Sequence, residues 1–561
     1  MGSTPQSVMK LQRFPCLLGS ALLLGLWPTS VHAQSVLQIV PDTTLPINSQ
    51  VIPGCTVCVI DGGTIRGSTL FHSFQFFSLG TGSAALFNNP ASIQTVLARV
   101  TGGSTSFING LLQTNGTASL FFLNPSGIVF GPNAQLNVGG SFVASTATSF
   151  QFPDGTEFSA TNPQAPPLLA VNVPLGLQHG PIAPGSTITN QGILTAGQDL
   201  TLVSDRLELQ GTLQANRHLT LQAQDTLQIR DTAQTPFLAQ AGGNLTLRGD
   251  RLVDILALNH PGFPFQSGGN LTVIGDGPIS TDAHFTAGGN FAVRQVNGAI
   301  ANFGSLQDPI FNVGGDFDVG NYGGASLLVT AGGNIRFGQV IISAVDPAIA
   351  PTRAFILRAG GNITATGDIV GFVPFFISPP FDSRLIVDFQ AGGNITTQSV
   401  FTTGGPITMV AQGSITTRTL STFANRVPPG AITLTSLGST IDTSAGELNT
   451  FARVGNGGAI TFTALGNITT GSMDSGSLEA GTVGGAIALT STGGAITALD
   501  TLRTDSFDGG AGPIQLNAAG NITTRDLFAF TFGDQNGGSI QAYSGGTFSA
   551  TDSLISNGTA G

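Results

Sequence analysis

Apolar and polar residues alternate with a period of two over much of the chain, and residues 118–142 show the pattern most fully. Their sequence, ASLFFLNPSGIVFGPNAQLNVGGSF, is interrupted at residues 124–127, 131–133 and 139–140. Asn and Gly accept turn geometry and Pro fixes φ, so each interruption predicts a tight turn between short strands. Strands and turns that alternate at roughly ten-residue intervals are typical of a β-solenoid coil.

A second pattern, a repeat, begins near residue 187. Residues 189–229 alternate Leu with polar residues almost throughout, and a Gly-Gly-Asn signature then recurs, as in AGGNLTL, SGGNLTV and AGGNITT. Its third residue recurs at intervals of 18 to 32 residues, at Asn244, Asn270, Asn290, Asp316, Asn334, Asn362 and Asn394. Repeats of this length indicate solenoid coils that carry loops of variable length.

Each part of the repeat has a physical rationale. Gly-Gly can adopt backbone angles that other residues resist, and the following Asn can bond neighbouring backbone, so that stacked copies form an amide ladder. The next apolar residue points inward and Thr points outward, as in a strand. One coil cannot bury its apolar face alone. We therefore predict an all-β protein whose residues 188–561 form a parallel β-helix of on the order of 14–18 coils.

Two other segments divide the chain. Residues 1–33 predict a secretory signal peptide, with a basic region, an apolar stretch over residues 16–27 and small residues before a cleavage site between Ala33 and Gln34. A proline-rich stretch interrupts the strand rhythm further on, and we place a boundary at residues 171–187.

Composition and charge exclude several classes of protein. Glycine makes up 78 of 561 residues without a collagen period, and charged residues make up only 9%. The net charge is −11 and Lys10 is the single lysine, so the surface is poorly suited to phosphate and we expect no nucleic-acid partner. No run of 18 consecutive apolar residues follows the signal peptide, so we expect no transmembrane span in the mature chain.

Residues 121–146, FFLNPSGIVFGPNAQLNVGGSFVAST, resemble the core of the filamentous-haemagglutinin N-terminal domain, the secretion domain of two-partner secretion exoproteins. The phrases GGTIRGSTLFHSFQFFSLGTG, ARVTGGSTSFINGLL and FPDGTEFSATNP match the family in the same order, and the resemblance spans residues 34–163. An earlier Asn-Pro element of the family is Asn89-Pro90. The family motif NPNGI corresponds to Asn124, Pro125, Ser126, Gly127 and Ile128, with Ser126 in place of the second Asn.

This resemblance implies a secretion domain over residues 34–170, at the N-terminal end of a right-handed parallel β-helix. It also implies a bacterium with an outer membrane, and an outer-membrane two-partner secretion transporter whose periplasmic domains recognise the secretion domain. The chain would then be secreted or held at the cell surface. The expected function is that of a β-helical adhesin or surface structural protein with an unknown host or cell-surface ligand.

Cys55 and Cys58 leave two interpretations open. On a regular strand they would point to opposite faces, so a disulfide needs a bend, which Pro53-Gly54 can supply. Otherwise both are free buried thiols. No other cysteine follows the signal peptide to complete a four-cysteine zinc site, and we expect neither a metal nor a cofactor.

The sequence predicts no catalytic site, and we expect no enzyme. The histidines show neither metal spacing nor a plausible Ser or Cys nucleophile beside them: His72, which we take as structural, His179, His218, His260 and His284. Asp316 and Asp318 form only a single copy of a calcium-like pattern. The alternative function is a β-helical carbohydrate-active enzyme, a lyase or hydrolase, which needs carboxylates clustered on adjacent coils. The candidates do not recur at one coil period: Asp250, Asp254, Asp382 and Asp388.

Overall fold

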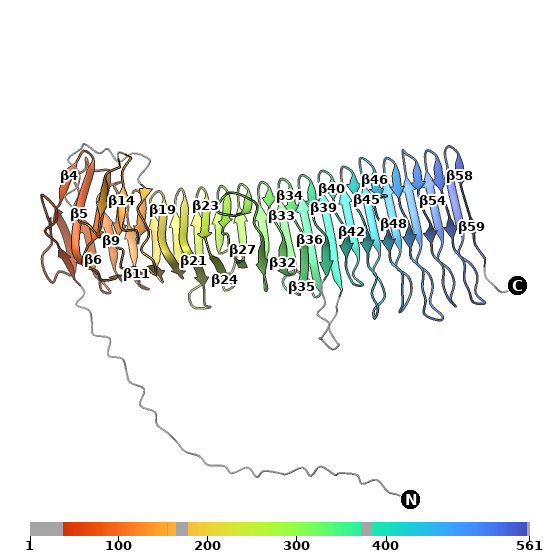
Figure 1. Cartoon of the computed structure of the whole chain (residues 1–561), viewed down its shortest axis with the longest axis horizontal. Coiled ribbons are helices and arrows are strands. Elements are labelled where there is room, and N and C mark those ends of the chain that lie inside the picture. The colour runs from red at the N-terminus through yellow and green to blue at the C-terminus, as the bar shows by residue number, and fades with distance from the viewer. Residues whose placement is uncertain (1–37, 154, 164–177, 372–383, 558–561) are drawn as a thin grey trace, which may run out of the picture. The chain divides into compact units, whose positions relative to one another are not determined.

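The computed structural model of the chain describes residues 38–153, 155–163, 178–371 and 384–557, and every regular element in these ranges is a β-strand. The predicted signal peptide with its cleavage site at Ala33 and Gln34, and residues 171–177 of the predicted boundary, lie outside the described residues. From Gln38 onward the chain forms one unit, an elongated stack of coils (Figure 1). Within the described ranges, no helix is long and apolar enough to cross a membrane.

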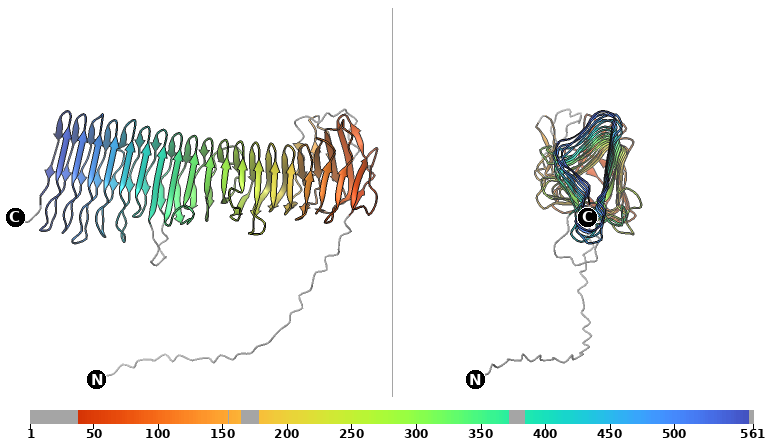
Figure 2. Two further views of the ribbon diagram at one scale, coloured as in Figure 1. Left: turned by 180° about the vertical axis from the view of Figure 1, so that it is seen from behind. Right: turned by 90° about the vertical axis from the view of Figure 1, so that its right-hand side faces the viewer.

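One coil shows how the stack is built. Three strands follow one another around it: β33 (Leu327–Ala331), β34 (Ile335–Phe337) and β35 (Val340–Ala344). Each pairs in parallel with its equivalent in the next coil: β36 (Arg353–Ala359), β37 (Ile363–Ala365) and β38 (Ile369–Gly371). The stack therefore has three faces, and seen along its length the coils superpose on a roughly triangular outline (Figure 2). This architecture is a parallel β-helix and confirms the predicted fold.

The strands predicted in residues 118–142 are the early coils of the same stack. They are β10 (Ser119–Leu123), β11 (Ile128–Phe130) and β12 (Gln135–Asn137), followed by β13 (Phe142–Ser145). β11, β12 and β13 pair in parallel with strands beyond the proline-rich stretch: β17 (Thr187–Asn190), β18 (Ile193–Ala196) and β19 (Leu200–Leu209). Neighbouring coils are therefore paired directly across the predicted boundary.

The coils after the boundary can be followed along the face that contains β33 and β36. Fourteen successive parallel pairings link β18 to β57 (Ile540–Ser544), which makes fifteen coils among the described residues. The final coil also contains β58 (Phe548–Ala550) and β59 (Leu554–Ile555). This number lies within the range expected from the repeat length.

The inward-facing residues of the three faces form one apolar cluster that extends from Ile39 to Ala529. Phenylalanines of successive coils stack inside it: the ring centroids of Phe265 and Phe285 lie 4.8 Å apart, and those of Phe285 and Phe311 lie 5.1 Å apart. Each inward side chain therefore loses its contact with water mainly by touching its equivalents in the coils on either side.

The predicted Asn ladder is present, with the backbone as donor. The N–H of Asn270 donates to Asn244 Oδ1 at 2.9 Å, and the N–H of Asn290 donates to Asn270 Oδ1 at 2.9 Å. The same bond recurs at each later signature residue up to Ser414, through Asp316, Asn334, Asn362 and Asn394. The ladder thus satisfies a backbone N–H at the corner of every one of these coils.

The signature glycines are required for a different reason from the one predicted. Gly360 and Gly361 do not have positive φ, so no unusual backbone angle demands glycine there. Instead, a Cβ on Gly360 would lie 2.1 Å from the carbonyl oxygen of Gly332, and one on Gly361 would lie 2.6 Å from Asn334 Oδ1. The close approach of neighbouring coils therefore excludes a side chain.

Gly360→Ala should destabilise the coils around it by roughly 2–3 kcal/mol, because the added methyl group would overlap the backbone of Gly332. Gly323→Ala is the matched control, since a Cβ at that position meets no atom within 4 Å. The measurement is hydrogen exchange of β36 and β37 in the full chain under increasing denaturant. Equal protection in the two variants would contradict the steric explanation.

Candidate functional site

The turn between β10 and β11 is built around the fully buried side chain of Asn124. The N–H of Ser126 donates to Asn124 Oδ1 at 2.9 Å, and the N–H of Gly127, which has a φ of 108°, donates to the Asn124 carbonyl at 3.1 Å. Asn124 Nδ2 donates to Ser104 O and to Ser106 Oγ, both at 2.9 Å. Asn124 therefore closes the turn and also ties it to the preceding coil.

The other residues of this motif have simpler roles. Ser126 is exposed, and its backbone carries the contacts, since its carbonyl also accepts a hydrogen bond from Thr105 Oγ1 at 2.8 Å. The replacement of Asn by Ser therefore leaves the hydrogen bonds of the turn in place. Pro125 is half-buried and restricts φ, while Ile128 is buried and begins β11.

The Asn89-Pro90 element lies at a different corner, after β6 (Ala84–Phe87). The side chain of Asn89 is buried and makes two bonds to the backbone of Asn115 in the next coil: Nδ2 donates to its carbonyl at 3.2 Å, and Oδ1 accepts its N–H at 2.9 Å. The N–H of Ile93 donates to the carbonyl of the exposed Pro90. The structure does not bring Asn89 and Asn124 together, and each fixes its own corner.

Antiparallel strands cover the first coil, and we call residues 38–66 the cap. β1 (Ile39–Pro41) and β4 (Thr64–Arg66) pair with β5 (Thr69–Phe77), and β2 (Ser49–Gln50) pairs with β3 (Val57–Gly62). β2 reaches only Asp61 and Gly62, so among the described residues Val57–Ile60 of β3 pair only with β6. The cap also exposes large aliphatic side chains: Ile47, Ile52, Val57, Val59 and Ile65.

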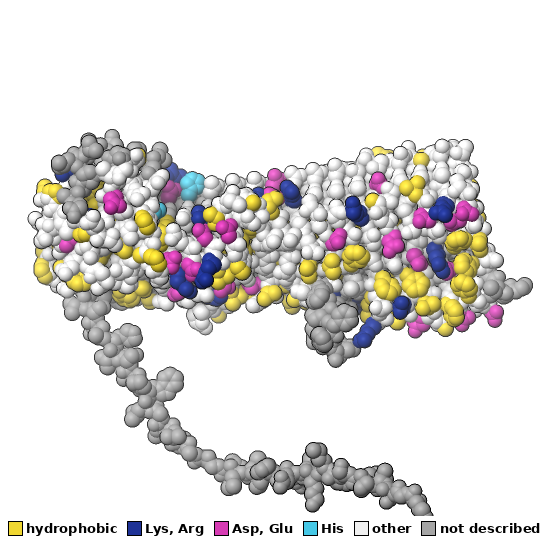
Figure 3. Space-filling view, in the orientation of Figure 1, with side chains coloured by type: hydrophobic (Ala, Val, Ile, Leu, Met, Phe, Trp, Pro, Cys, Tyr) yellow, Lys and Arg dark blue, Asp and Glu magenta, His cyan; other side chains and the backbone are white. Residues whose placement is uncertain are grey.

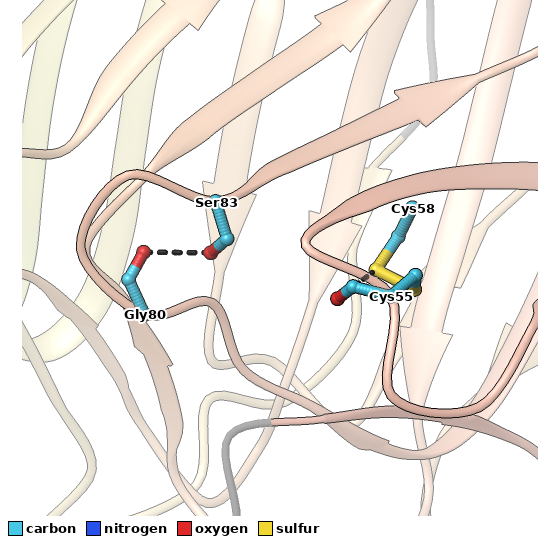
Figure 4. The surroundings of a disulfide bond; sticks show 4 residues. All are labelled: Cys55, Cys58, Gly80 and Ser83. Atoms are coloured by element: carbon cyan, nitrogen blue, oxygen red, sulfur yellow. Dashed lines mark hydrogen bonds between the residues drawn. A yellow bond between two sulfur atoms is a disulfide. The ribbon is translucent and has the colours of Figure 1, made fainter.

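A disulfide joins Cys55 and Cys58 at the entrance to β3 (Figure 4). Their Cα atoms lie 5.1 Å apart. Cys55 precedes the strand and Cys58 lies within it, and the chain turns at Pro53-Gly54, where Gly54 has a φ of 76°. The bend that a bridge requires is therefore supplied by the Pro53-Gly54 pair, and the cysteines do not share one regular strand.

A small sheet lies outside the stack and covers part of the first coils. It consists of β14 (Ser149–Gln151), β15 (Glu157–Ser159) and β16 (Gln178–His179), all antiparallel. Its apolar side chains form a second buried cluster with outward-facing residues of the first coils, which includes Phe71, Leu97, Leu123, Val143, Phe150, Phe152 and Phe158. The strands beneath this sheet are therefore buried on both faces.

A buried arginine that the sequence analysis did not single out links the cap, the stack and the small sheet. Arg99 lies in β7 (Thr95–Val100), and its guanidinium donates to Ser73 Oγ at 2.9 Å, Ser159 O at 2.7 Å and Thr44 Oγ1 at 2.9 Å. It also lies 4.3 Å from the centre of the Phe158 ring. The signal in the sequence is an arginine inside the otherwise apolar run TVLARV.

Asp42 supplies the negative charge of this network. Its Oδ1 accepts the N–H of Thr44 at 3.0 Å, and its Oδ2 accepts Ser73 Oγ at 2.6 Å and Thr101 Oγ1 at 2.7 Å. Burial raises the pKa of Asp42, but these hydrogen bonds outweigh it and hold the pKa below its usual value. Burial lowers the pKa of Arg99 to about 10, against the opposing effect of Asp42, so both groups are charged at neutral pH.

His72 of β5 is buried where the first coil meets the cap. Its Nδ1 lies 3.0 Å from Ser49 Oγ, and its ring packs against Phe74 and Phe87. Burial lowers the pKa of His72 to about 3, with a smaller opposing effect from Asp61. The imidazole is therefore neutral and packs as a structural residue.

The carboxylates considered for the enzyme alternative are engaged by arginines. Asp250 pairs with Arg248, Asp254 with Arg230 and Asp388 with Arg358, while Asp382 lies outside the described residues. Asp316 accepts a ladder bond and Asp318 pairs with Arg294. In the part of the chain that the structure describes, no group of three or more His, Cys, Asp or Glu could hold a metal ion.

The geometry defines a class of protein, a parallel β-helix whose first coil is closed by an antiparallel cap. The family model described as "TPS secretion domain" matches residues 37–293. This part of the chain is a two-partner secretion domain, and the resemblance found in the sequence is confirmed. The match extends past residue 170 and crosses the predicted boundary, as the strand pairings do.

Two solved secretion domains are similar to the chain. The filamentous hemagglutinin secretion domain is 14% identical and covers 59% of this chain and 99% of its own, with a TM-score of 0.29. The HMW1 secretion domain from Haemophilus influenzae is 14% identical and covers 92% of this chain and 100% of its own, with a TM-score of 0.25. No curated protein matches the chain.

Arg99→Leu should destabilise the cap by about 3–5 kcal/mol, because it leaves three polar partners without their donors and removes the positive charge near the half-buried Asp42. Arg336→Leu, at an exposed position of β34, is the control for loss of a positive charge. Hydrogen exchange of β1 and β5 measures the effect. Protection of the cap that survives Arg99→Leu would contradict its role as the link.

The stability of the cap should also fall in acid. His72 is held neutral in the folded state, whereas the unfolded histidine takes up a proton near its ordinary pKa of 6.5. Stability is therefore complete above about pH 6.5 and decreases as the pH falls from there toward 3. Hydrogen exchange of β5, corrected for the chemical rate, should show this decline, and His72→Gln should flatten it. An acid profile that the substitution leaves unchanged would exclude His72 as its source.

Proposed function

We propose that the chain is a filamentous-haemagglutinin-like exoprotein exported by two-partner secretion, and that its rod acts as an adhesin or surface structural protein. It would pass through the periplasm of a bacterium with an outer membrane and reach the medium or the cell surface. The secretion-domain match over residues 37–293, on a rod with a capped first coil, carries this proposal. Charged side chains are sparse on the visible face of the rod, and positive and negative ones often lie side by side (Figure 3). Such a surface favours a non-catalytic role.

The partner in export would be an outer-membrane two-partner secretion transporter, contacted through its periplasmic domains. A strand edge without a partner can accept a strand from another protein. Val57–Ile60 of β3 offer such an edge next to the exposed side chains of Val57 and Val59, and the Cys55–Cys58 disulfide holds the chain that leads into it. We place the export signal in residues 34–170, which contain this edge, and the rod in residues 188–561.

The motif residues would act indirectly. Asn89 and Asn124 are buried in the folded domain, so the transporter could not touch their side chains there. They fix corners between neighbouring coils. Their substitution would therefore impair export by disturbing how the secretion domain folds.

Export of the full chain, co-expressed with its transporter, tests this proposal. Val59→Lys and Asn124→Ala should each lower the fraction in the medium severalfold, the first by placing a charge at the edge and the second by opening the turn. Ser126→Asn, at an exposed side chain, and Ile193→Lys, on the exposed surface of β18, are the controls and should be exported as wild type.

The outcomes separate the parts of the proposal. Equal export after deletion of the transporter would refute the two-partner route. Normal export of Val59→Lys would refute the β3 edge as the docking site, and normal export of Asn124→Ala would refute the role given to the turn.

A further inference from the structure

A cluster of ionisable side chains, used neither by the ladder nor by the proposed export signal, lies at one corner of the middle coils. His284 is in β27 (Ile279–Ala287), Asp308 precedes β30 (Ile310–Val313), and Asp346 lies in the loop 345–352, between β35 and β36. His284 pairs with Ile310 across the two coils. The three residues come from three different coils, which the sequence spacing did not reveal.

Their contacts form a chain. His284 Nε2 lies 2.7 Å from Asp308 Oδ1. The side chain of Asp308 also interacts with that of Asp346. Asp346 is only 2% exposed. Its Oδ1 accepts the N–H of Ala348 at 2.9 Å, but no donor among the described residues bonds to its buried Oδ2. Two facing carboxyl groups with an unsatisfied buried oxygen cannot both stay ionised, and a shared proton resolves the conflict.

We propose that Asp308 and Asp346 share one proton and, with protonated His284, form a pH-operated clasp that holds the loop 345–352 against the rod. The clasp is closed at mildly acidic pH and opens as the pH rises through neutrality. The clasp controls the conformation of one loop of the rod, and its existence does not depend on the proposed route of export.

The charged and titratable groups nearest the cluster are bonded to other atoms in the described part of the chain. Asp282 is buried and accepts Ser305 Oγ at 2.7 Å. Burial raises the pKa of Tyr322 well above its usual value, so its hydroxyl stays neutral and donates to Ala325 O. Arg353 of β36 donates to Ile342 O.

The pKa shifts of Asp346 and His284 both predict that the clasp weakens as the pH rises. Burial, and then the proximity of Asp308, raises the pKa of Asp346 to about 6, and the hydrogen bond to Asp308 raises the pKa of His284. Burial acts to raise the pKa of Asp308, but the bond and the charge of His284, together with the bond to Asp346, outweigh it and lower that pKa. Below about pH 6 the cluster is therefore neutral overall, with one carboxylate, one carboxylic acid and one imidazolium. As the pH rises through the raised pKa values, both protons leave, the two carboxylates repel, and the stability that the clasp contributes is lost.

Hydrogen exchange of residues 345–352 in the full chain, corrected for the chemical rate, tests the clasp between pH 5 and pH 8. The opening equilibrium should increase by about tenfold or more over this range, because a pKa that differs by about one between the closed and the open loop changes the equilibrium constant tenfold. Asp346→Asn should keep the loop protected at both pH values, because an amide donates to Asp308 without titrating. Asp442→Asn is the matched control: Asp442 also accepts the N–H of the residue two positions on, at 3.0 Å, and its variant should keep the wild-type profile.

Protection of the wild-type loop that is equal at pH 5 and pH 8 would overturn the proposal. If Asp346→Asn loosens the loop at both pH values, infrared spectroscopy tests the shared proton directly. In difference spectra against Asp346→Asn, which cancel the contributions of other carboxyl groups such as Asp474, wild type and Asp442→Asn should show a carboxylic-acid C=O band at pH 5 that disappears by pH 8. Absence of that band in wild type would refute the shared proton.

Discussion

The structure depends on contact between each coil and the next. Each strand satisfies its backbone groups through parallel pairing with the neighbouring coils, and each inward side chain is covered by its equivalents above and below. The Asn ladder and the signature glycines both follow from this constraint. Asn supplies an acceptor for an N–H at a corner, and glycine allows the corner backbones to approach closely.

A stack of this kind has an exposed edge at its first coil unless something covers it. Here β1, β2 and β4 provide the cover, and the network of Arg99 and Asp42 ties the chain after β1 to β5 and β7. The small outer sheet contributes Ser159 and Phe158 to the same network. The part of the molecule that matches a secretion domain therefore also contains the polar network that joins the cap to the stack.

Much of this arrangement was predictable from the sequence, because strand period and turn chemistry are local properties. The turn at Asn124, the strand from Ile128 to Phe130 and the ladder at Asn244 and its equivalents all follow from residues that are close in sequence or regularly spaced. The role predicted for the signature glycines is wrong. Atoms of the neighbouring coil leave no space for a side chain at these positions, and the φ angles of the glycines do not require glycine.

The long-range features could not be predicted in this way. Arg99 meets Thr44 and Ser159 from positions 55 and 60 residues away, and no local pattern encodes that meeting. The same holds for Asp308 and Asp346, which interact although they come from different coils. The pairing of β13 with β19 could not be predicted for the same reason, because the proline-rich sequence between these two strands contains no repeat.

The ladder has a consequence for how the rod can change over evolutionary time. Its hydrogen bond is 2.6 Å long where 18 residues separate Asp316 from Asn334, and 2.8 Å long where 32 residues separate Asn362 from Asn394. The fixed corner is thus insensitive to the length of the rest of the coil. Insertions and deletions can accumulate at the other corners without shifting the register of the scaffold, so that one frame can display loops of many lengths and sequences to whatever surrounds it.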